Sequence, residues 1–214
     1  MVKKRKMNMD YLTVGKYAET EYIVNKSRFI GYCKPVSTAE EAVDFINSVR
    51  AKHREATHNV YAYAVRSPEY SRYSDDGEPQ GTAGQPTLDV IKKSGLTDVC
   101  IVVTRYFGGI LLGAGGLVRA YSHSASLAVE AAGIVKMGLC EVFETESDYS
   151  RYERLEKLIV SCGGTVESTD FSDRVRIVFR IHADKSEDMH KKLTDMSYGE
   201  LEAVKIGEKF DICV

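Results

Sequence analysis

Residues 75–86 (DDGEPQGTAGQP) bring together side chains that can do chemistry. Three carboxylates, Asp75, Asp76 and Glu78, stand beside Thr82 and two glycines. Oxygen ligands at this density can hold a divalent cation or serve as acid and base. The spacing of a calcium-binding loop is absent, however, and a polar turn whose Asp side chains bond their own backbone accounts for the same residues. We therefore predict a turn and no metal site.

A second segment, residues 104–121 (TRYFGGILLGAGGLVRAY), is rich in glycine and carries two arginines. Its five glycines separate a predicted strand from a predicted helix: Gly108, Gly109, Gly113, Gly115 and Gly116. Bare backbone N–H groups and the helix dipole can converge on an anion at such a junction. Arg105 and Arg119 flank the turn and can add bidentate bonds to a phosphate. The alternative is that the glycines only permit a tight turn and close helix packing.

Neither segment contains a complete nucleotide-binding motif. The GTAG run at 81–84 lacks the Lys-Ser/Thr of a triphosphate loop, and Val118 stands where a dinucleotide fingerprint has its third glycine. We predict no ATP, no NAD and no other cofactor. Catalytic roles for His53, His58 and His123 are not favoured either. Ser122 stands next to His123, but adjacent residues do not face each other along a helix, so no Ser–His nucleophile pair follows.

The elements that position these segments follow from periodicity and turn residues. Thr38 and Glu41 have the spacing of a capping box, which predicts that a helix follows them. The β-branched run at 99–107 is typical of a strand buried on both faces. In the first half we predict a β-hairpin at 16–36, a helix after Thr38, a strand at 58–66, a loop over 74–85, a helix at 86–93, a strand at 99–107 and an Ala-rich helix at 117–132.

The second half shows a fresh pattern, and its predicted order is βαββαβ. Asp184 and Glu187 repeat the capping spacing before the second helix. The predicted elements are a strand at 138–147, a helix at 149–162, strands at 165–171 and 174–182, a helix at 185–197 and a strand at 202–213. This is the ferredoxin-like split arrangement, which hosts many functions and implies none.

Composition sets the class of protein. The 214 residues are 43% hydrophobic and 28% charged, as in ordinary globular chains, and contain no run of about 20 apolar residues and no signal peptide. We expect a cytoplasmic protein without a membrane anchor. Five scattered cysteines predict neither zinc nor disulfides. Residues 1–137 carry 18 Lys and Arg against 14 Asp and Glu, whereas residues 138–214 carry 11 against 17, an asymmetry that hints at nucleic acid. The basic run at 3–6 supplies the excess in the first half.

The two segments, in this order and about twenty residues apart, resemble the signature of the YigZ/IMPACT family in its bacterial two-domain form. The resemblance implies an α+β protein. Its N-terminal domain would have the ribosomal-protein-like βαβ fold of elongation factor G domain IV, and its C-terminal domain would be ferredoxin-like. We accordingly predict an N-terminal tail at 1–15, an IMPACT-type domain at 16–137 and a ferredoxin-like domain at 138–214.

Domains with these folds contact RNA and the ribosome, and eukaryotic relatives resemble translation regulators. The leading hypothesis is therefore a translation-linked protein that binds RNA or the ribosome. Its contact residues would be Arg105, Tyr106, Gly108, Gly109, Gly113, Gly116 and Arg119, with Tyr106 stacking on a base. The remaining matched motif residues are Asp75, Asp76, Gly77, Glu78, Gly81, Thr82 and Gly84.

Two alternatives stay open. One is a module that binds a regulatory protein partner, with glycines that are purely structural. The other, ranked last, is an enzyme acting on a phosphorylated small molecule, which predicts a concave pocket where both segments meet. The resemblance supplies no catalytic residue.

Overall fold

The computed structural model describes residues 10–66 and 68–212. The basic run at 3–6 and Cys213 therefore lie outside the described residues. The chain divides into two compact units, Tyr11–Val135, here called the N-terminal domain, and residues from Lys136 on together with Asp10, here called the C-terminal domain. No helix in the described ranges has the length and apolar character that crossing a bilayer requires.

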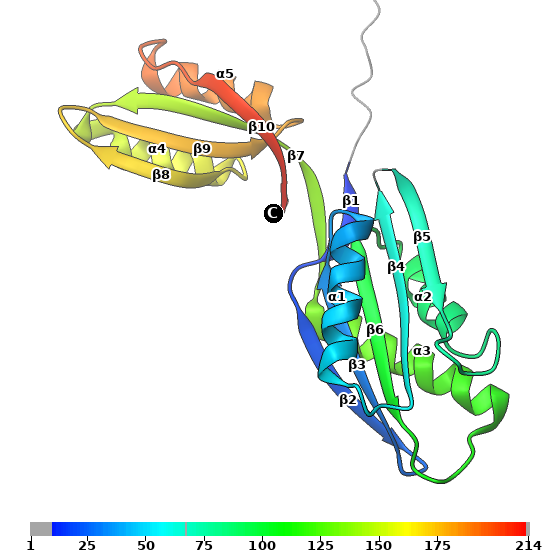
Figure 1. Ribbon diagram of the computed structural model, residues 1–214. Coiled ribbons are helices and arrows are strands. Elements are labelled where there is room, and N and C mark those ends of the chain that lie inside the picture. The colour runs from blue at the N-terminus through cyan, green and yellow to red at the C-terminus, as the bar shows by residue number, and fades with distance from the viewer. Residues whose placement is uncertain (1–9, 67, 213–214) are drawn as a thin grey trace, which may run out of the picture. The chain divides into compact units, whose positions relative to one another are not determined.

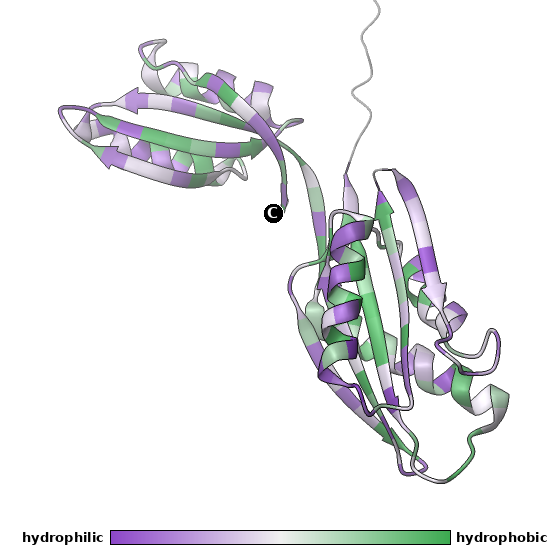
Figure 2. Ribbon diagram, in the orientation of Figure 1, coloured by the Kyte–Doolittle hydropathy of each residue, from purple (hydrophilic) through white to green (hydrophobic). Residues whose placement is uncertain are grey.

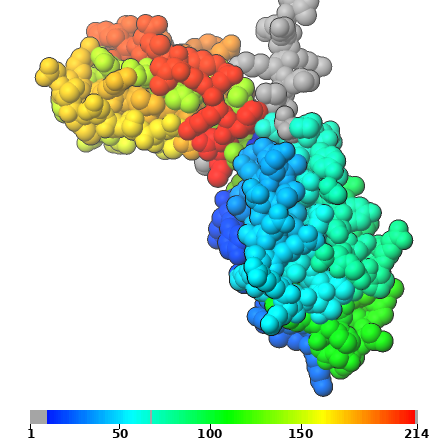
Figure 3. Space-filling model, viewed as in Figure 1, coloured from blue at the N-terminus to red at the C-terminus, as the bar shows by residue number. Residues whose placement is uncertain are grey.

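The N-terminal domain is an antiparallel sheet with helices on both faces. Its elements are β1 (Tyr11–Val14), β2 (Ala18–Val24), β3 (Ser27–Pro35), α1 (Ala39–Lys52), β4 (His58–Arg66), β5 (Glu69–Ser74), α2 (Gly84–Lys93), β6 (Val99–Tyr106) and α3 (Gly113–Ala132). The strand order is β2-β3-β6-β4-β5. Figure 1 shows α1 on one face of this sheet and α2 and α3 on the other, and in Figure 3 α1 covers its face.

The central strand β6 is buried on both faces, as its β-branched sequence predicts. Val99, Ile101 and Val103 pack into the core under α2 and α3, while Cys100 and Val102 pack under α1. Figure 2 shows the resulting apolar band along β6. Because alternate side chains of a strand point to opposite faces, one strand serves two cores.

Local signals fix the helices on both faces. Thr38 is the N-cap of α1 and accepts a hydrogen bond from the Glu41 N–H, while the Glu41 side chain accepts one from the Ser37 N–H. Helix α3 lies very close to β3, and the absence of a side chain at Gly31 allows this. A Cβ on Gly31 would come within 2.7 Å of the Ser124 carbonyl oxygen and 3.2 Å of the Ala128 Cβ. The predicted cap of α1 is therefore observed, and Gly31 allows α3 to approach the sheet closely.

Several predicted boundaries differ from the structure. Residues 11–14 form β1 inside the range predicted as a tail. Strand β5 covers residues 69–74, of which only residue 74 belongs to the predicted loop and the other five precede it. β5 was missed because it is an exposed edge strand with no apolar alternation. Helix α3 begins at Gly113, earlier than the predicted residue 117, so Gly113, Gly115 and Gly116 lie in its first turn, while Gly108 and Gly109 precede it.

The C-terminal domain has the βαββαβ order. Its elements are β7 (Ile134–Ser147), α4 (Tyr149–Ser161), β8 (Thr165–Phe171), β9 (Val175–His182), α5 (Ser186–Ser197) and β10 (Val204–Ile212). β7 pairs with both β9 and β10, and β9 pairs with β8. Leu155, Phe179 and Leu193 belong to one core shared by α4, the sheet and α5. The prediction that Asp184 caps α5 is wrong, because the N-cap is Lys185 and Asp184 instead bonds His182.

Two histidines hold opposite protonation preferences in the two domains. His53 lies between the hydroxyls of Tyr32 and Tyr106, at 2.5 and 2.8 Å, and burial lowers its pKa. Burial also acts to lower the pKa of His182, but hydrogen bonds to Asp184 and Asp10 outweigh it and raise this pKa above its usual value. The N-terminal domain therefore favours neutral His53, and the C-terminal domain favours charged His182.

We predict opposite pH responses of the two domains. A raised pKa at His182 gives stability that is full below the unfolded value of about 6.5 and is lost as the pH rises through the folded value. A lowered pKa at His53 costs stability as the pH falls below about 6.5. Amide hydrogen exchange between pH about 5.5 and about 8 should show β9 better protected at the acid end and β3 better protected at the alkaline end. His182→Gln should remove the first trend only, and parallel trends in both domains would contradict the assignment.

Candidate functional site at one end of the N-terminal sheet

Asp75 organises the first motif from within. Its carboxylate accepts hydrogen bonds from three backbone N–H groups, those of Gly81 at 2.9 Å, Ala83 at 3.1 Å and Gly84 at 2.8 Å. The last two belong to the start of α2, whose own N-cap residue gives no side-chain bond. Asp75 therefore caps α2 from eight residues upstream. Its bonds to the backbone of its own segment are of the type that the predicted polar turn requires.

Asp76 links the motif to its neighbours. Its side chain accepts from Arg50 of α1 at 2.6 Å and from the Asn59 backbone N–H of β4 at 2.7 Å, and its carbonyl oxygen lies 2.8 Å from His58 Nδ1. The Thr82 hydroxyl donates to the Pro79 carbonyl oxygen at 2.7 Å. Among the described residues no group of His, Cys, Asp and Glu side chains is arranged to hold a metal ion. These side chains shape the loop.

Three side chains from adjacent strands form a row at the end of the sheet. Arg105 near the end of β6 pairs in register with Phe29 of β3 on one side and with His58 of β4 on the other. Because directly opposite residues in antiparallel strands point to the same face, all three face α3. Strand register thus brings His58 to the second motif, although 47 residues separate it from Arg105 in the sequence.

Glu78 of the first motif reaches into this row and joins the two motifs. Its Oε1 accepts from Arg105 Nη1 at 2.6 Å and from the Tyr121 hydroxyl at 2.7 Å. The Glu78 side chain is 3% exposed and that of Arg105 6%. Burial and the neighbouring Glu78 charge raise the pKa of Tyr121, so its hydroxyl stays a donor. The two motifs are therefore one structural unit.

Two predicted contact residues do not face solvent as the phosphate hypothesis requires. The Arg105 guanidinium lies 5.4 Å from the ring centroids of both Phe29 and Phe107 and is held by Glu78, so its charge is already compensated. Tyr106 points to the opposite face of the sheet, where its hydroxyl meets His53. Strand alternation separates these neighbours. Arg119, by contrast, is exposed on α3.

The glycines shape the loop between β6 and α3. A Cβ on Gly108 would fall 2.0 Å from the Lys26 carbonyl carbon, so the β2–β3 turn can rest against this residue only if it is glycine. Its N–H donates to the Ser27 hydroxyl at 3.2 Å. Left-handed backbone angles occur at Gly77, Gly81, Gly109 and Gly113. A Cβ on Gly116 would come close to the Leu112 side chain, and a Cβ on Gly84 would come close to the Ser74 backbone.

A cleft of about 370 Å³ opens where the motifs meet. Its lining combines an apolar wall, a polar floor and the bare start of α3: Thr57, His58, Gly77, Glu78, Pro79, Arg105, Phe107, Leu111, Leu112, Gly113, Ala114 and Leu117. The enzyme hypothesis predicts a concavity in this place. The sequence raises a catalytic role for His58 without favouring it, and it does not identify the apolar wall; the register of β4 against β6 is the signal that places His58 in the site.

The rim of this end is apolar and cationic. Phe107, Ile110 and Leu111 are 45%, 42% and 85% exposed. Lys26, Arg54 and Arg119 are exposed and, within the described part of the chain, form no ion pair. Figure 1 shows the β2–β3 turn, the end of α1 and the loop into α3 together at this end of the domain. We call this surface, with the cleft, the motif end.

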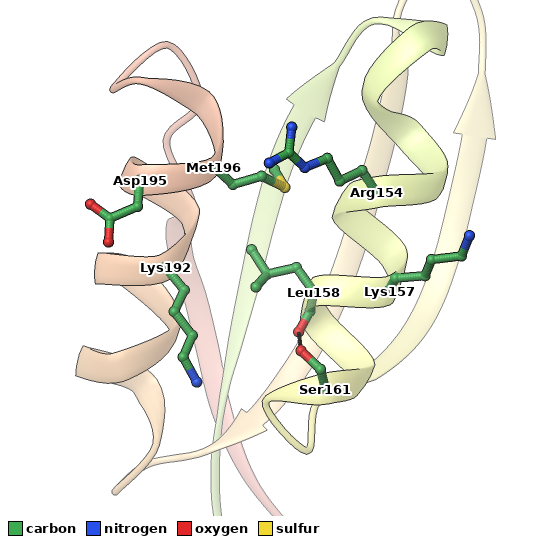
Figure 4. A pocket seen from close by; sticks show the side chains of 7 residues that line it. All are labelled: Arg154, Lys157, Leu158, Ser161, Lys192, Asp195 and Met196. Atoms are coloured by element: carbon green, nitrogen blue, oxygen red, sulfur yellow. Dashed lines mark hydrogen bonds between the residues drawn. The ribbon is translucent and has the colours of Figure 1, made fainter.

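The C-terminal domain has a groove of about 540 Å³ between α4 and α5, drawn in Figure 4. Leu158 and Met196 lie between the helices, and Arg154, Lys157, Lys192 and Asp195 surround them. Lys192 is paired with Asp188 at 2.7 Å. The sheet of this domain carries its own charge pairs, such as Arg180 with Glu167 at 3.2 Å and with Asp211 at 3.1 Å. Neither this groove nor this sheet contains a residue of the two motifs at 75–86 and 104–121.

Comparison with known proteins gives matches in both domains. Residues 25–129 match the Impact N-terminal domain, and residues 145–200 match a domain of unknown function, DUF1949. The chain is 38% identical to the IMPACT family member YvyE of Bacillus subtilis, covering 92% of this chain and 91% of that one. It is 35% identical to the IMPACT family member YigZ of Escherichia coli, covering 86% and 92%. A crystal structure of a hypothetical protein matches with TM-score 0.60 and 32% identity over 94% of this chain and 98% of its own.

We predict that breaking the Glu78–Arg105 pair destabilises the N-terminal domain strongly. Arg105→Met leaves a buried, uncompensated carboxylate and should cost about 3–5 kcal/mol of unfolding free energy, measured by urea denaturation. The double variant Glu78→Leu/Arg105→Met should recover much of that loss, because it removes both charges. A single variant that costs less than about 1 kcal/mol would show that the pair is not structural.

Proposed function

Because this chain belongs to the IMPACT family, we propose that it acts in translation by binding RNA or the ribosome through the motif end of its N-terminal domain. The observation that carries the proposal is that Lys26, Arg54 and Arg119, which form no ion pair among the described residues, are exposed on segments at the motif end, whose loop into α3 also carries the exposed ring of Phe107.

The cations suit a phosphate backbone. Each lies on a different segment, the β2–β3 turn, the loop after α1 and the second turn of α3, so they form a spread patch and not a single point charge. Glu55 next to Arg54 offsets part of the charge. Contacts of this kind position a nucleic acid without reading its sequence. Helix α3 adds a first turn without an acidic residue or a side-chain cap, which is favourable for an anion.

Phe107 takes the stacking role that the sequence suggested for Tyr106. Its ring is 45% exposed, and the Arg105 guanidinium lies on it from inside. The backbone N–H of Phe107 donates to the Thr57 hydroxyl at 3.0 Å, which holds the residue at the rim. A base stacked on such a ring contributes about 1–3 kcal/mol. Arg105 and Glu78 support this ring from below instead of touching the phosphates.

A protein partner is the second candidate, and the exposed aliphatic residues favour it. Leu111 is 85% exposed and Ile110 42%, on a loop that Figure 2 colours as hydrophobic. Nucleic acid does not need such side chains, whereas a protein interface buries them. Leu111→Asp should abolish capture of a protein partner after nuclease treatment but leave salt-dependent RNA binding in place.

An enzyme acting on a phosphorylated small molecule is the third candidate. The cleft at the motif end and the proximity of His58 to Glu78, 3.8 Å between Nε2 and Oε2, favour it. The chain itself identifies no substrate. Turnover lost in His58→Ala, with folding retained, would move this candidate forward.

We predict salt-dependent binding of short single-stranded RNA. With about three phosphate contacts, the logarithm of the affinity should fall with the logarithm of the salt concentration with a slope of about −2. Arg54→Glu/Arg119→Glu should weaken binding at least about tenfold at low salt and flatten this slope. Fluorescence anisotropy at several salt concentrations measures both quantities.

The matched control is Lys93→Glu. Lys93 is an exposed lysine at the end of α2, six residues before the start of β6 and thus at the opposite end of the sheet from the motif end. It makes the same charge change per site. The proposal fails if the intact protein binds neither RNA nor ribosomes, or if the control weakens binding as much as the double variant.

A further inference from the structure

One oxygen of the buried Glu78 carboxylate has no hydrogen-bond donor among the described residues. Oε1 accepts from Arg105 and from Tyr121, but no hydrogen bond reaches Oε2. The side chain is 3% exposed, and the residue lines the cleft of the motif end. Because Glu78 lines the cleft, this oxygen offers a free acceptor position to which a bound group can donate.

His58 presents a second acceptor to the same space. Its Nδ1 lies 2.8 Å from the carbonyl oxygen of Asp76, which can only accept, so the proton of the neutral ring is on Nδ1. Nε2 is then an acceptor, and it lies 3.8 Å from Glu78 Oε2. That distance is too long for a direct hydrogen bond. Two acceptors thus stand side by side at the floor of the cleft.

The charges select the kind of donor. Arg105 compensates Glu78, so the floor has no net negative charge when His58 is neutral, and the nearby start of α3 is the positive end of its dipole. An ammonium group is therefore disfavoured. Adjacent neutral hydroxyls fit better, because each can donate to one acceptor. A carboxylate that binds ribose hydroxyls in this way is the recurring solution for the ribose of dinucleotides.

The remaining walls suit the rest of a nucleotide. Phe107, Leu111 and Leu112 form an apolar side on which a base can lie, and the backbone of Gly113 and Ala114 at the start of α3 lies where a phosphate is favourable. The volume of about 370 Å³ is within the roughly 300–1,000 Å³ typical of small-ligand clefts.

We propose that the cleft binds the ribose of a nucleotide through its 2′,3′-cis-diol, with the two hydroxyls donating to Glu78 Oε2 and His58 Nε2. This deepens the proposed function and rests on it for the ligand's source: in an RNA the free diol occurs at the 3′ end, so the motif end would capture a 3′-terminal nucleotide. A free 5′-nucleotide carries the same chemistry and is the other source.

The test compares ligands that differ only in the diol. Isothermal titration measures the affinity of the full chain for a short single-stranded RNA with an ordinary 3′ end and for the same RNA ending in a 2′,3′-dideoxynucleotide. A second arm uses adenosine 5′-monophosphate and its 2′,3′-dideoxy analogue. We expect the loss of the diol to weaken binding at least about tenfold, since one of the two bonds goes to a charged group.

Variants assign the effect to the cleft. His58→Ala keeps the Glu78–Arg105 pair and should bring the ratio between diol and dideoxy ligands close to one. Glu78→Gln should do the same, and His58→Ala remains informative if the Gln variant does not fold. Lys93→Glu, at the opposite end of the sheet, should leave the ratio unchanged.

The outcomes separate the two proposals. Equal affinity for diol and dideoxy ligands in both arms overturns the ribose site, while RNA binding itself leaves the proposed function standing. A diol preference only for the mononucleotide supports the site and removes RNA as its source. A diol preference that survives in His58→Ala overturns the placement in this cleft. No binding of either ligand class overturns the ribose site and removes RNA from the proposed function, which then fails as well if ribosomes are not bound.

Discussion

The buried ion pair between Glu78 and Arg105 is the contact on which the motif end depends. The two residues come from a turn and from the end of the central strand, and the Tyr121 hydroxyl of α3 completes the same cluster. A guanidinium and a carboxylate removed from water stabilise a fold only when both are well satisfied. The pair therefore holds the two motifs in one fixed arrangement and is not a source of net stability.

The contacts inside the two motifs determine which side chains of the motif end remain exposed. Asp75 bonds backbone N–H groups inside the first motif, Asp76 bonds α1 and β4, and Gly108 lets the β2–β3 turn rest on the second motif. The exposed side chains at the rim are above all Phe107 and Leu111, together with Lys26, Arg54 and Arg119, which form no ion pair in the described part of the chain. The C-terminal domain shows instead a groove between two helices and a sheet crossed by ion pairs.

Much of the fold could be predicted from the sequence, and less of the site. The Thr38–Glu41 cap and the double-sided burial of the strand that ends at Tyr106 follow from local chemistry and periodicity. The partner of Arg105 does not, since a charge at the end of an apolar strand can turn to water or to an anion, and Glu78 is 27 residues away in the sequence. His58 was undervalued for the same reason: it joins the site through strand register, which a single sequence does not reveal. The family resemblance gave the domains but no roles.

The most direct test is to map RNA binding onto the chain by amide chemical shifts of the nitrogen-15-labelled protein. Titration with a short single-stranded RNA should shift the amide signals of residues 57–58, 77–78 and 107–114, which surround the cleft and its rim. It should leave the amides of the C-terminal domain in place. Shifts concentrated in the groove between α4 and α5, or on the sheet of the C-terminal domain, would contradict the claim that the motif end is the functional surface.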